Sequence, residues 1–264
     1  MNVEETADKV WVIEDSSLNI CLIEGREKAL LIDTGWGTGR LLKVVSSLTS
    51  LPLIVVNTHG HIDHISGNFE FDHAYIKSDD LENAHIIFTK EYRTHFIERF
   101  APKGYSKGFP SDFLPEGWIE REFDNFISLD DIKYFDLGDR IVDIINTPGH
   151  TAGSICLFDN NSGLLFSGDT ISEGNVLVNL KESLSLGTFL NSIDNLIAFA
   201  SKINYIVPYH GRYKLDPSIL YEHKDAVEKI LSGEIKGTPR NSVLGNGLFC
   251  RFNAFTLAYS ETNL

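Results

Sequence analysis

Three histidines and one aspartate gather within a single short stretch of the chain. The run from His59 to His64 has the sequence HGHIDH. Imidazole and carboxylate groups are the usual protein ligands of zinc and of similar divalent metals. By chance, such a run arises in about one chain in a thousand of this size. The run therefore predicts a metal site in which His59 and His61 face one point, while Asp63 and His64 turn toward a second.

Two metals need more ligands than this run supplies, because a catalytic metal takes about three protein ligands and keeps one position open. Three candidates share a place at the end of a later predicted strand: His150, Asp169 and His210. Each is followed by Gly or Thr. In open α/β folds the side chains at the carboxyl ends of strands converge on one edge of a sheet. We expect these three residues to complete a two-metal site.

We expect such a site to catalyse hydrolysis. Two divalent ions a few ångströms apart lower the pKa of a shared water toward neutrality, so that hydroxide forms at pH 7. This hydroxide attacks an electrophilic carbonyl or phosphorus, and one metal stabilises the developing oxyanion. Asp63 or Asp169 could hold the nucleophile or pass its proton to the leaving group. A serine nucleophile is not expected, since the chain has no GxSxG motif.

The elements that must position these residues occur in two similar cycles. The first comprises predicted strands, a helix and a buried strand at Lys9–Glu14, Leu18–Glu24, Ala29–Asp33, Thr38–Leu48 and Leu53–Asn57. The predicted inward face of its helix carries Leu41, Leu42, Val45 and Leu48. The second repeats that order at Arg140–Asn146, Ser154–Asp159, Gly163–Ser167, Leu186–Lys202 and Tyr205–Pro208. The predicted inward residues of its helix are Phe189, Ile193, Leu196 and Phe199. An apolar strand ends in Asp33 or Asp169, and a later one ends beside His59 or His210. This order predicts an internal duplication, with chance similarity of two α/β halves as the alternative.

Residues 75–131 interrupt the pattern. Asp79 with Glu82 resembles a capping box at a helix start. Aromatic residues then recur every four positions, which predicts an aromatic ridge on one helix: Phe88, Tyr92, Phe96 and Phe100. A stretch rich in Gly and Pro follows, between Pro102 and Trp118, which is too long for a plain connection. The segment is either an insertion packed on the core or a lid that walls the substrate site. A helix over 217–231 and one strand pair within 242–259 end the chain.

The composition of the chain limits the classes of partner that it is expected to bind. The net charge of −14 disfavours nucleic acid, and basic residues form no strong cluster. The N-terminus has no apolar core of a secretory signal, and no apolar run reaches the roughly 18 residues that span a bilayer. Cys21, Cys156 and Cys250 are widely spaced, as buried reduced thiols would be. We expect a cytoplasmic protein that acts on a small molecule, with its oligomeric state left open.

In this order, the seven candidate ligands resemble the signature of the metallo-β-lactamase superfamily. The HxHxDH run is followed by His150 in TPGHT, Asp169 in SGDT and His210 in PYHG. The resemblance covers about residues 9–212. It implies an α/β fold, a four-layer αββα sandwich of two mixed β-sheets flanked by helices, as a single domain over residues 1–264 with the aromatic-rich insertion at 75–131.

The resemblance also implies a division of the ligands. His59, His61 and His150 would bind one metal, Asp63, His64 and His210 the other, and Asp169 would bridge the two. Asp33 in LIDTG matches a position that supports a ligand from behind. Tyr209 could donate a hydrogen bond to an oxyanion, and packing is an equal interpretation. Zinc is the favoured metal, and iron and manganese accept the same donors.

Within the family, the chain is most similar in character to hydroxyacylglutathione hydrolases and lactonases. We therefore expect a dinuclear metal-dependent hydrolase that cleaves a small ester, thioester or lactone. The alternatives are a phosphodiester hydrolase on the same site, an iron-dependent oxidoreductase such as a persulfide dioxygenase, and a non-catalytic binding protein.

Overall fold

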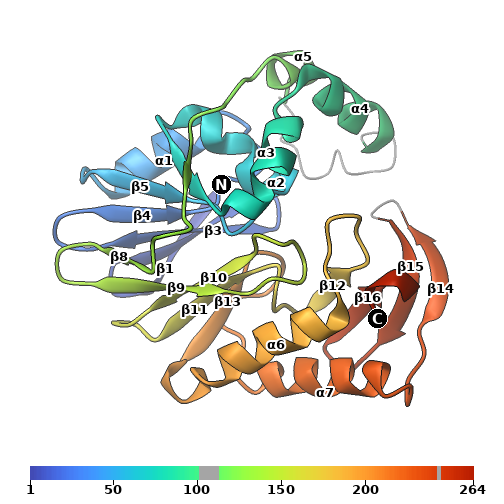
Figure 1. Ribbon diagram of the computed structural model, residues 1–264. Coiled ribbons are helices and arrows are strands. Elements are labelled where there is room, and N and C mark those ends of the chain that lie inside the picture. Colours follow the sequence, from blue (N-terminus) through green and yellow to red (C-terminus); the bar gives the residue numbers. More distant parts are fainter. Residues whose placement is uncertain (101–112, 243–244) are drawn as a thin grey trace. The chain divides into compact units, whose positions relative to one another are not determined.

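The computed structural model describes residues 1–100, 113–242 and 245–264 (Figure 1). The Gly- and Pro-rich stretch from Pro102 to Pro110 lies outside these ranges. The chain divides into two compact units, Met1–Ile141 and Val142–Leu264. Within the described ranges, each helix is too short or too polar to cross a membrane.

The first unit is built on a seven-stranded sheet with the strands in chain order. Its strands are β1 (Asn2–Ala7), β2 (Val10–Asp15), β3 (Leu18–Glu24), β4 (Ala29–Ile32), β5 (Leu53–Val56), β6 (Ala74–Ile76) and β7 (Phe126–Ser128). Pairing is antiparallel from β1 to β4 and parallel from β4 to β7. Strand β1 was not predicted, because its side chains are mostly exposed and show no apolar alternation.

Helices of the first unit follow its strands. They are α1 (Leu41–Leu48), α2 (Ile62–Ile65), η1 (Ser66–Glu70), η2 (Ser78–Asp80), α3 (Leu81–Ile87), α4 (Lys90–Phe100) and α5 (Pro115–Ile119). The predicted inward face of α1 is only partly right: Leu41 and Val45 are buried, but Leu42 is 43% exposed. The first turn of the predicted helix, from Thr38, is not helical.

Two local predictions in the insertion were wrong. The aromatic residues do not share one helix, because α3 ends at Ile87 and Thr89 starts a new one, its Oγ1 accepting the Tyr92 N–H at 3.2 Å. The capping box is also absent: Asp80 occupies the N-cap of α3, and its side chain does not cap that helix. The Asp80 carboxylate instead accepts a hydrogen bond from the Gly60 N–H.

A buried arginine organises the described aromatic residues of the insertion. The Arg93 guanidinium lies 4.5 Å from the Phe88 ring centre and 4.4 Å from that of Trp118. It donates to the Ile87 carbonyl at 3.1 Å and to the Trp118 carbonyl at 2.8 Å. Burial lowers the pKa of Arg93 to about 9. Phe88, Phe96 and Trp118 are buried, and the ring centres of Phe96 and Trp118 lie 6.1 Å apart. The lid role of the insertion stays a prediction.

The second sheet repeats the pairing order of the first. It has the order β13-β11-β10-β9-β8, with β8 (Tyr134–Asp136), β9 (Ile141–Asn146), β10 (Ile155–Asp159), β11 (Leu164–Gly168) and β13 (Tyr205–Pro208). From β9 to β13 the pairs are antiparallel, antiparallel and parallel. The same sequence of pairings joins β2, β3, β4 and β5, as the predicted duplication requires.

A third, four-stranded sheet extends the second unit beyond the prediction. Its order is β12-β16-β15-β14, with β12 (Gly174–Val178), β14 (Thr238–Ser242), β15 (Gly245–Arg251) and β16 (Phe255–Tyr259). The expected C-terminal strand pair corresponds to β15 and β16. Strand β14 was missed because its sequence TPRNS is almost wholly exposed and lacks an apolar pattern.

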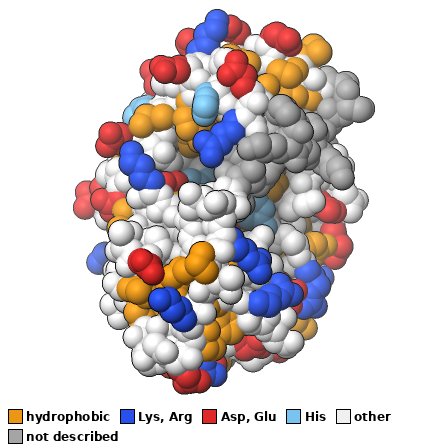
Figure 2. All heavy atoms as spheres, turned by 90° about the vertical axis from the view of Figure 1, so that its right-hand side faces the viewer, with side chains coloured by type: hydrophobic (Ala, Val, Ile, Leu, Met, Phe, Trp, Pro, Cys, Tyr) orange, Lys and Arg blue, Asp and Glu red, His pale blue; other side chains and the backbone are white. Residues whose placement is uncertain are grey.

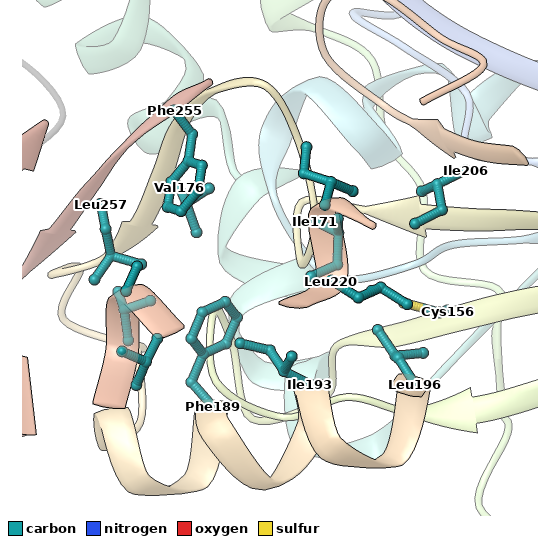
Figure 3. Packing of buried hydrophobic residues seen from close by; sticks show 14 of the residues in the cluster. Cys156, Ile171, Val176, Phe189, Ile193, Leu196, Ile206, Leu220, Phe255 and Leu257 are labelled. Atoms are coloured by element: carbon teal, nitrogen blue, oxygen red, sulfur yellow. The ribbon is translucent and has the colours of Figure 1, made fainter. Parts of the chain in front are cut away.

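The helices of the second unit, α6 (Leu186–Ile197) and α7 (Ile219–Leu231), lie side by side, with the short turns η5 (Ala200–Lys202) and η6 (Glu261–Asn263) following α6 and β16 (Figure 1). The predicted inward residues Phe189, Ile193 and Leu196 of α6 are buried, and Figure 3 shows them pointing into one apolar cluster with residues of the neighbouring strands. Burial of each such side chain contributes about 1.5–3 kcal/mol. Phe199 lies beyond the helix end and is only half-buried.

Candidate metal centre

The HGHIDH run lies where β5 ends and α2 begins. Nε2 of His59 and Nδ1 of His61 lie 2.9 Å apart, so the two imidazoles converge. Two nitrogen ligands of one tetrahedral zinc ion would lie about 3.3 Å apart. The geometry of this pair is therefore close to that of two ligands of one metal.

The second half of the run points differently because the backbone changes conformation. His61 has the extended backbone of an N-cap, whereas Asp63 and His64 belong to the short helix α2. The ligand atoms of Asp63 and His64 lie within 4.8 Å of each other. The change from extended chain to helix separates the run into the two pairs expected from its sequence.

Asp33 supports the second pair from behind. Its carboxylate accepts hydrogen bonds from the Thr58 N–H and hydroxyl, both at 2.8 Å, and lies 2.9 Å from Nδ1 of His64. Because the carboxylate accepts, Nδ1 of His64 carries the hydrogen and Nε2 is left for a metal. Asp33 adopts a left-handed backbone with a φ of 61°, which aspartate tolerates better than most residues.

Asp80 and Asn83 hold the peptide between the first two histidines. The Gly60 N–H donates to Oδ2 of Asp80, and the Asn83 amide donates to the Gly60 carbonyl, both at 2.8 Å. A Cβ at residue 60 would lie 3.0 Å from the Asp80 carbonyl oxygen, so glycine permits this close approach. No local pattern marks these contacts in the sequence, since the partners are 20 or more residues apart.

The later candidate ligands meet within the second unit. Nε2 of His150 lies 3.5 Å from Oδ2 of Asp169, and Nε2 of His210 lies 3.5 Å from Oδ1 of the same carboxylate. Asp169 therefore faces a different histidine with each oxygen. Nδ1 of His150 is 2.7 Å from the Leu177 carbonyl of β12, which fixes the hydrogen on Nδ1 and directs Nε2 toward Asp169.

Tyr209 and His223 are both interior residues. Tyr209 is 2% exposed, and its N–H donates to the Gly168 carbonyl at 3.1 Å, so its role as a substrate contact stays a prediction. His223, which lies outside the predicted ligand set, is a packing residue. It is fully buried, with its ring stacked 3.9 Å from that of Phe255. Burial lowers its pKa to about 4.

Cysteine chemistry has no place at this centre. Cys21, Cys156 and Cys250 are buried and free, as expected. Burial raises the pKa of Cys156 to about 11, so this thiol stays protonated at neutral pH and is a poor nucleophile.

The donor groups fit divalent metals. Each unit carries part of the predicted set, namely His59, His61, Asp63 and His64 in the first and His150, Asp169 and His210 in the second. Imidazole and carboxylate donors suit zinc, and iron and manganese accept them as well. The pairs at 2.9 and 3.5 Å bracket the separation of about 3.3 Å between two zinc ligands.

The chain is similar in sequence to two characterised hydrolases and in fold to a solved structure. The chain is 28% identical over 211 residues to the human acyl-coenzyme A thioesterase MBLAC2, covering 73% of this chain and 72% of that protein. It is 24% identical over 198 residues to hydroxyacylglutathione hydrolase GloC of Haemophilus influenzae, covering 74% and 86%. A metallo-beta-lactamase family protein of Thermus thermophilus has a similar structure, with a TM-score of 0.64, 20% identity and coverage of 90% and 86%.

The family profile described as the metallo-beta-lactamase superfamily matches residues 14–236. This match spans most of the chain, and the structural similarity confirms the expected α/β fold class with its mixed sheets. The chain belongs to the metallo-beta-lactamase superfamily.

Proposed function

We propose that the protein is a metal-dependent hydrolase that cleaves a thioester in a small molecule at a two-metal site. His59, His61 and His150 would hold one ion, and Asp63, His64 and His210 the other, with Asp169 shared.

The observation that carries the proposal is the arrangement of Asp169 between two histidines. In a single-metal site of two histidines and one carboxylate, both imidazole nitrogens would face the same metal-binding oxygen. Here each oxygen faces its own imidazole nitrogen at 3.5 Å. This geometry favours two metal positions with a carboxylate common to both.

When bound, two divalent ions would supply Lewis acidity toward the substrate oxygen and lower the pKa of a water nucleophile. The protein orients the donors: Asp33 and the Leu177 carbonyl hold the Nδ1 hydrogens of His64 and His150. Asp63 is only partly buried at the start of α2, where its carboxylate could take a proton from the nucleophile and pass it to the leaving thiol.

The choice of thioester over lactone or ester comes from the relatives. One is named an acyl-coenzyme A thioesterase and the other a hydroxyacylglutathione hydrolase. Both names describe hydrolysis of a thioester. A thiol is also a better leaving group than an alcohol, so a weakly basic nucleophile suffices for the reaction.

The test is metal content and turnover of the purified protein on thioester, lactone and phosphodiester substrates. We expect about two equivalents of zinc for each chain and turnover fastest on thioesters. His61→Ala should lose both metal and turnover, and His95→Ala, which changes an exposed histidine, should retain both. Unchanged turnover in His61→Ala would refute the proposal. Stoichiometric iron with thiol-dependent oxygen consumption would replace it with an oxidoreductase.

A further inference from the structure

The third sheet has a charge pattern unlike that of the whole chain. Although the net charge is −14, the segment from Ile235 to Ser260 contains no aspartate or glutamate, and its charged residues are Lys236, Arg240 and Arg251. All three are exposed. Figure 2 views the molecule from the side on which β14 and β15 lie, and Lys and Arg side chains gather in its lower half.

Strand register places the two arginines on one face of the sheet. Arg240 of β14 pairs with Gly247 of β15, and Arg251 lies four residues farther along β15. Side chains alternate between the faces of a strand, so Gly247, Phe249 and Arg251 share a face, and directly opposed residues point the same way. Arg240 therefore joins Phe249 and Arg251 on this face. The opposite face carries the buried Leu248 and Cys250.

The arginines are available to an anion. The Arg240 guanidinium lies 5.7 Å from the Phe249 ring centre, and Nη1 of Arg251 donates to the Thr256 hydroxyl at 3.1 Å. Across residues 1–100, 113–242 and 245–264, neither forms an ion pair with a carboxylate. Phe249, only partly exposed, presents an aromatic ring between the two charges.

This face is connected to the candidate metal centre through the sheet itself. Leu177 of β12 pairs with Ala258 of β16, and Ala258 pairs with Phe249 of β15. The Leu177 carbonyl is the acceptor for His150. Phe249 and Leu177 therefore lie in the same cross-strand row, two strand spacings or about 10 Å apart.

We propose that the face formed by Arg240, Phe249 and Arg251 binds the phosphorylated, base-bearing end of a thiol carrier whose thioester is cleaved at the metal centre. Guanidinium groups pair with phosphate oxygens in a bidentate manner, and an aromatic ring stacks on a nucleobase. A thiol carrier with carboxylates alone, such as glutathione, would give Phe249 no ring to contact. The proposal rests on the proposed function and narrows its substrate to a nucleotide-bearing thioester.

Binding and turnover test this separately. Coenzyme A and pantetheine, which lacks the nucleotide, are titrated calorimetrically against the metal-loaded protein, where both ligands present the same thiol to the metal. We expect coenzyme A to bind at least about tenfold more tightly, with the difference shrinking at roughly 0.5 M salt because exposed charge pairs are screened. The double variant Arg240→Gln/Arg251→Gln should abolish the difference, and Phe249→Ala should reduce it. Arg99→Gln, an exposed arginine of α4 in the other unit, is the matched control and should bind as the parent does.

The kinetic arm uses acetyl-coenzyme A and S-acetylpantetheine. The double variant should raise KM about tenfold for acetyl-coenzyme A and leave the constants for S-acetylpantetheine unchanged. If the parent protein hydrolyses both thioesters with equal KM values, this inference is overturned, but the hydrolase proposal still holds. Arginine-dependent binding of coenzyme A without turnover of any thioester would support the binding face and overturn the hydrolase proposal.

Discussion

Nδ1 of His64 lies 2.9 Å from Oδ2 of Asp33, and both side chains are buried. The carboxylate also accepts two hydrogen bonds from Thr58, one from its N–H and one from its hydroxyl, and these contacts fix the orientation of the carboxylate. His64 is thereby held in one tautomer and one ring position, which is what a metal ligand requires.

Asp33→Asn should weaken metal binding without unfolding the protein. Asparagine tolerates the left-handed backbone at this position, but its neutral amide is a weaker acceptor for the His64 hydrogen. We expect zinc affinity to fall about 10- to 100-fold, measured by competition with a chromophoric chelator. Circular dichroism and the Tm of the metal-free variant check folding. Parent-like zinc affinity in a folded variant would show that Asp33 does not support the ligand.

Asp80 should act as a positioning residue for the HGHIDH run. Asp80→Ala removes the acceptor of the Gly60 N–H, a hydrogen bond to a charged group that contributes about 1.5–3 kcal/mol. We expect zinc affinity to fall about tenfold or more and Asp80→Asn, which keeps an acceptor oxygen, to restore part of it. The neighbouring exposed Asp79 supplies the control, since Asp79→Ala should leave zinc affinity unchanged. If both alanine variants behave alike, Asp80 has no special role.

Removal of metal should destabilise the native protein. A ligand that binds only the folded state stabilises it by about 4 kcal/mol at a thousandfold excess over Kd. We expect dipicolinate to lower the Tm and abolish turnover, and added zinc to restore both. A Tm that is insensitive to chelator and zinc alike would argue against a metal bound to the folded chain.

His223 should make the metal-free protein less stable in acid. Its pKa falls from 6.5 to about 4 on burial, so between these values the unfolded chain binds a proton that the native chain does not. Stability is therefore lost as pH falls from about 6.5 to about 4, by up to about 3 kcal/mol. Urea unfolding at about pH 7 and about pH 4.5, with chelator present, measures this loss. His223→Leu should show a smaller loss, and an equal one would assign the effect to other groups.

Arg93 should be a large contributor to the stability of the first unit. Arg93→Ala removes the side-chain donor of the Ile87 carbonyl and one of the donors of the Trp118 carbonyl, which keeps the Arg121 N–H, and it opens a cavity between two rings. We expect a loss of about 3 kcal/mol or more in the free energy of unfolding. Arg93→Lys should recover only part, because an ammonium cannot stack flat against both rings. His95→Ala, on the exposed side of the same helix, should change stability by less than about 0.5 kcal/mol.

The parts of the fold predicted from the sequence are those with strong local signals. Apolar runs located β2 to β5 and β9 to β11, because buried strands differ in composition from the turns around them. Strands β1 and β14 are held to their neighbours mainly by backbone hydrogen bonds, which any residue can make. Their exposed side chains therefore left no pattern to interpret.

In the candidate site, too, some residues have strong local signals in the sequence and others have none. The ligand residues stand out because three histidines crowd into one run and each later candidate ends a strand. The contacts of Asp80 and Asn83 with Gly60 join parts of the chain at least 20 residues apart, and such pairs cannot be identified from one sequence. The periodic aromatic pattern favoured one continuous helix, whereas α3 and α4 are separate helices. The local mark of the boundary is the Thr89 hydroxyl, which accepts a hydrogen bond from the Tyr92 N–H at the start of α4.

The shared carboxylate of Asp169 couples the occupancy of the two proposed metal positions. An ion at the His150 position would orient the carboxylate that the His210 position also needs, so filling one position would raise the affinity of the other. By thermodynamic reciprocity the two positions influence each other by the same factor. Loading should then be cooperative, with few singly occupied molecules at intermediate zinc, and the dependence of turnover on free zinc should be steeper than for two independent positions.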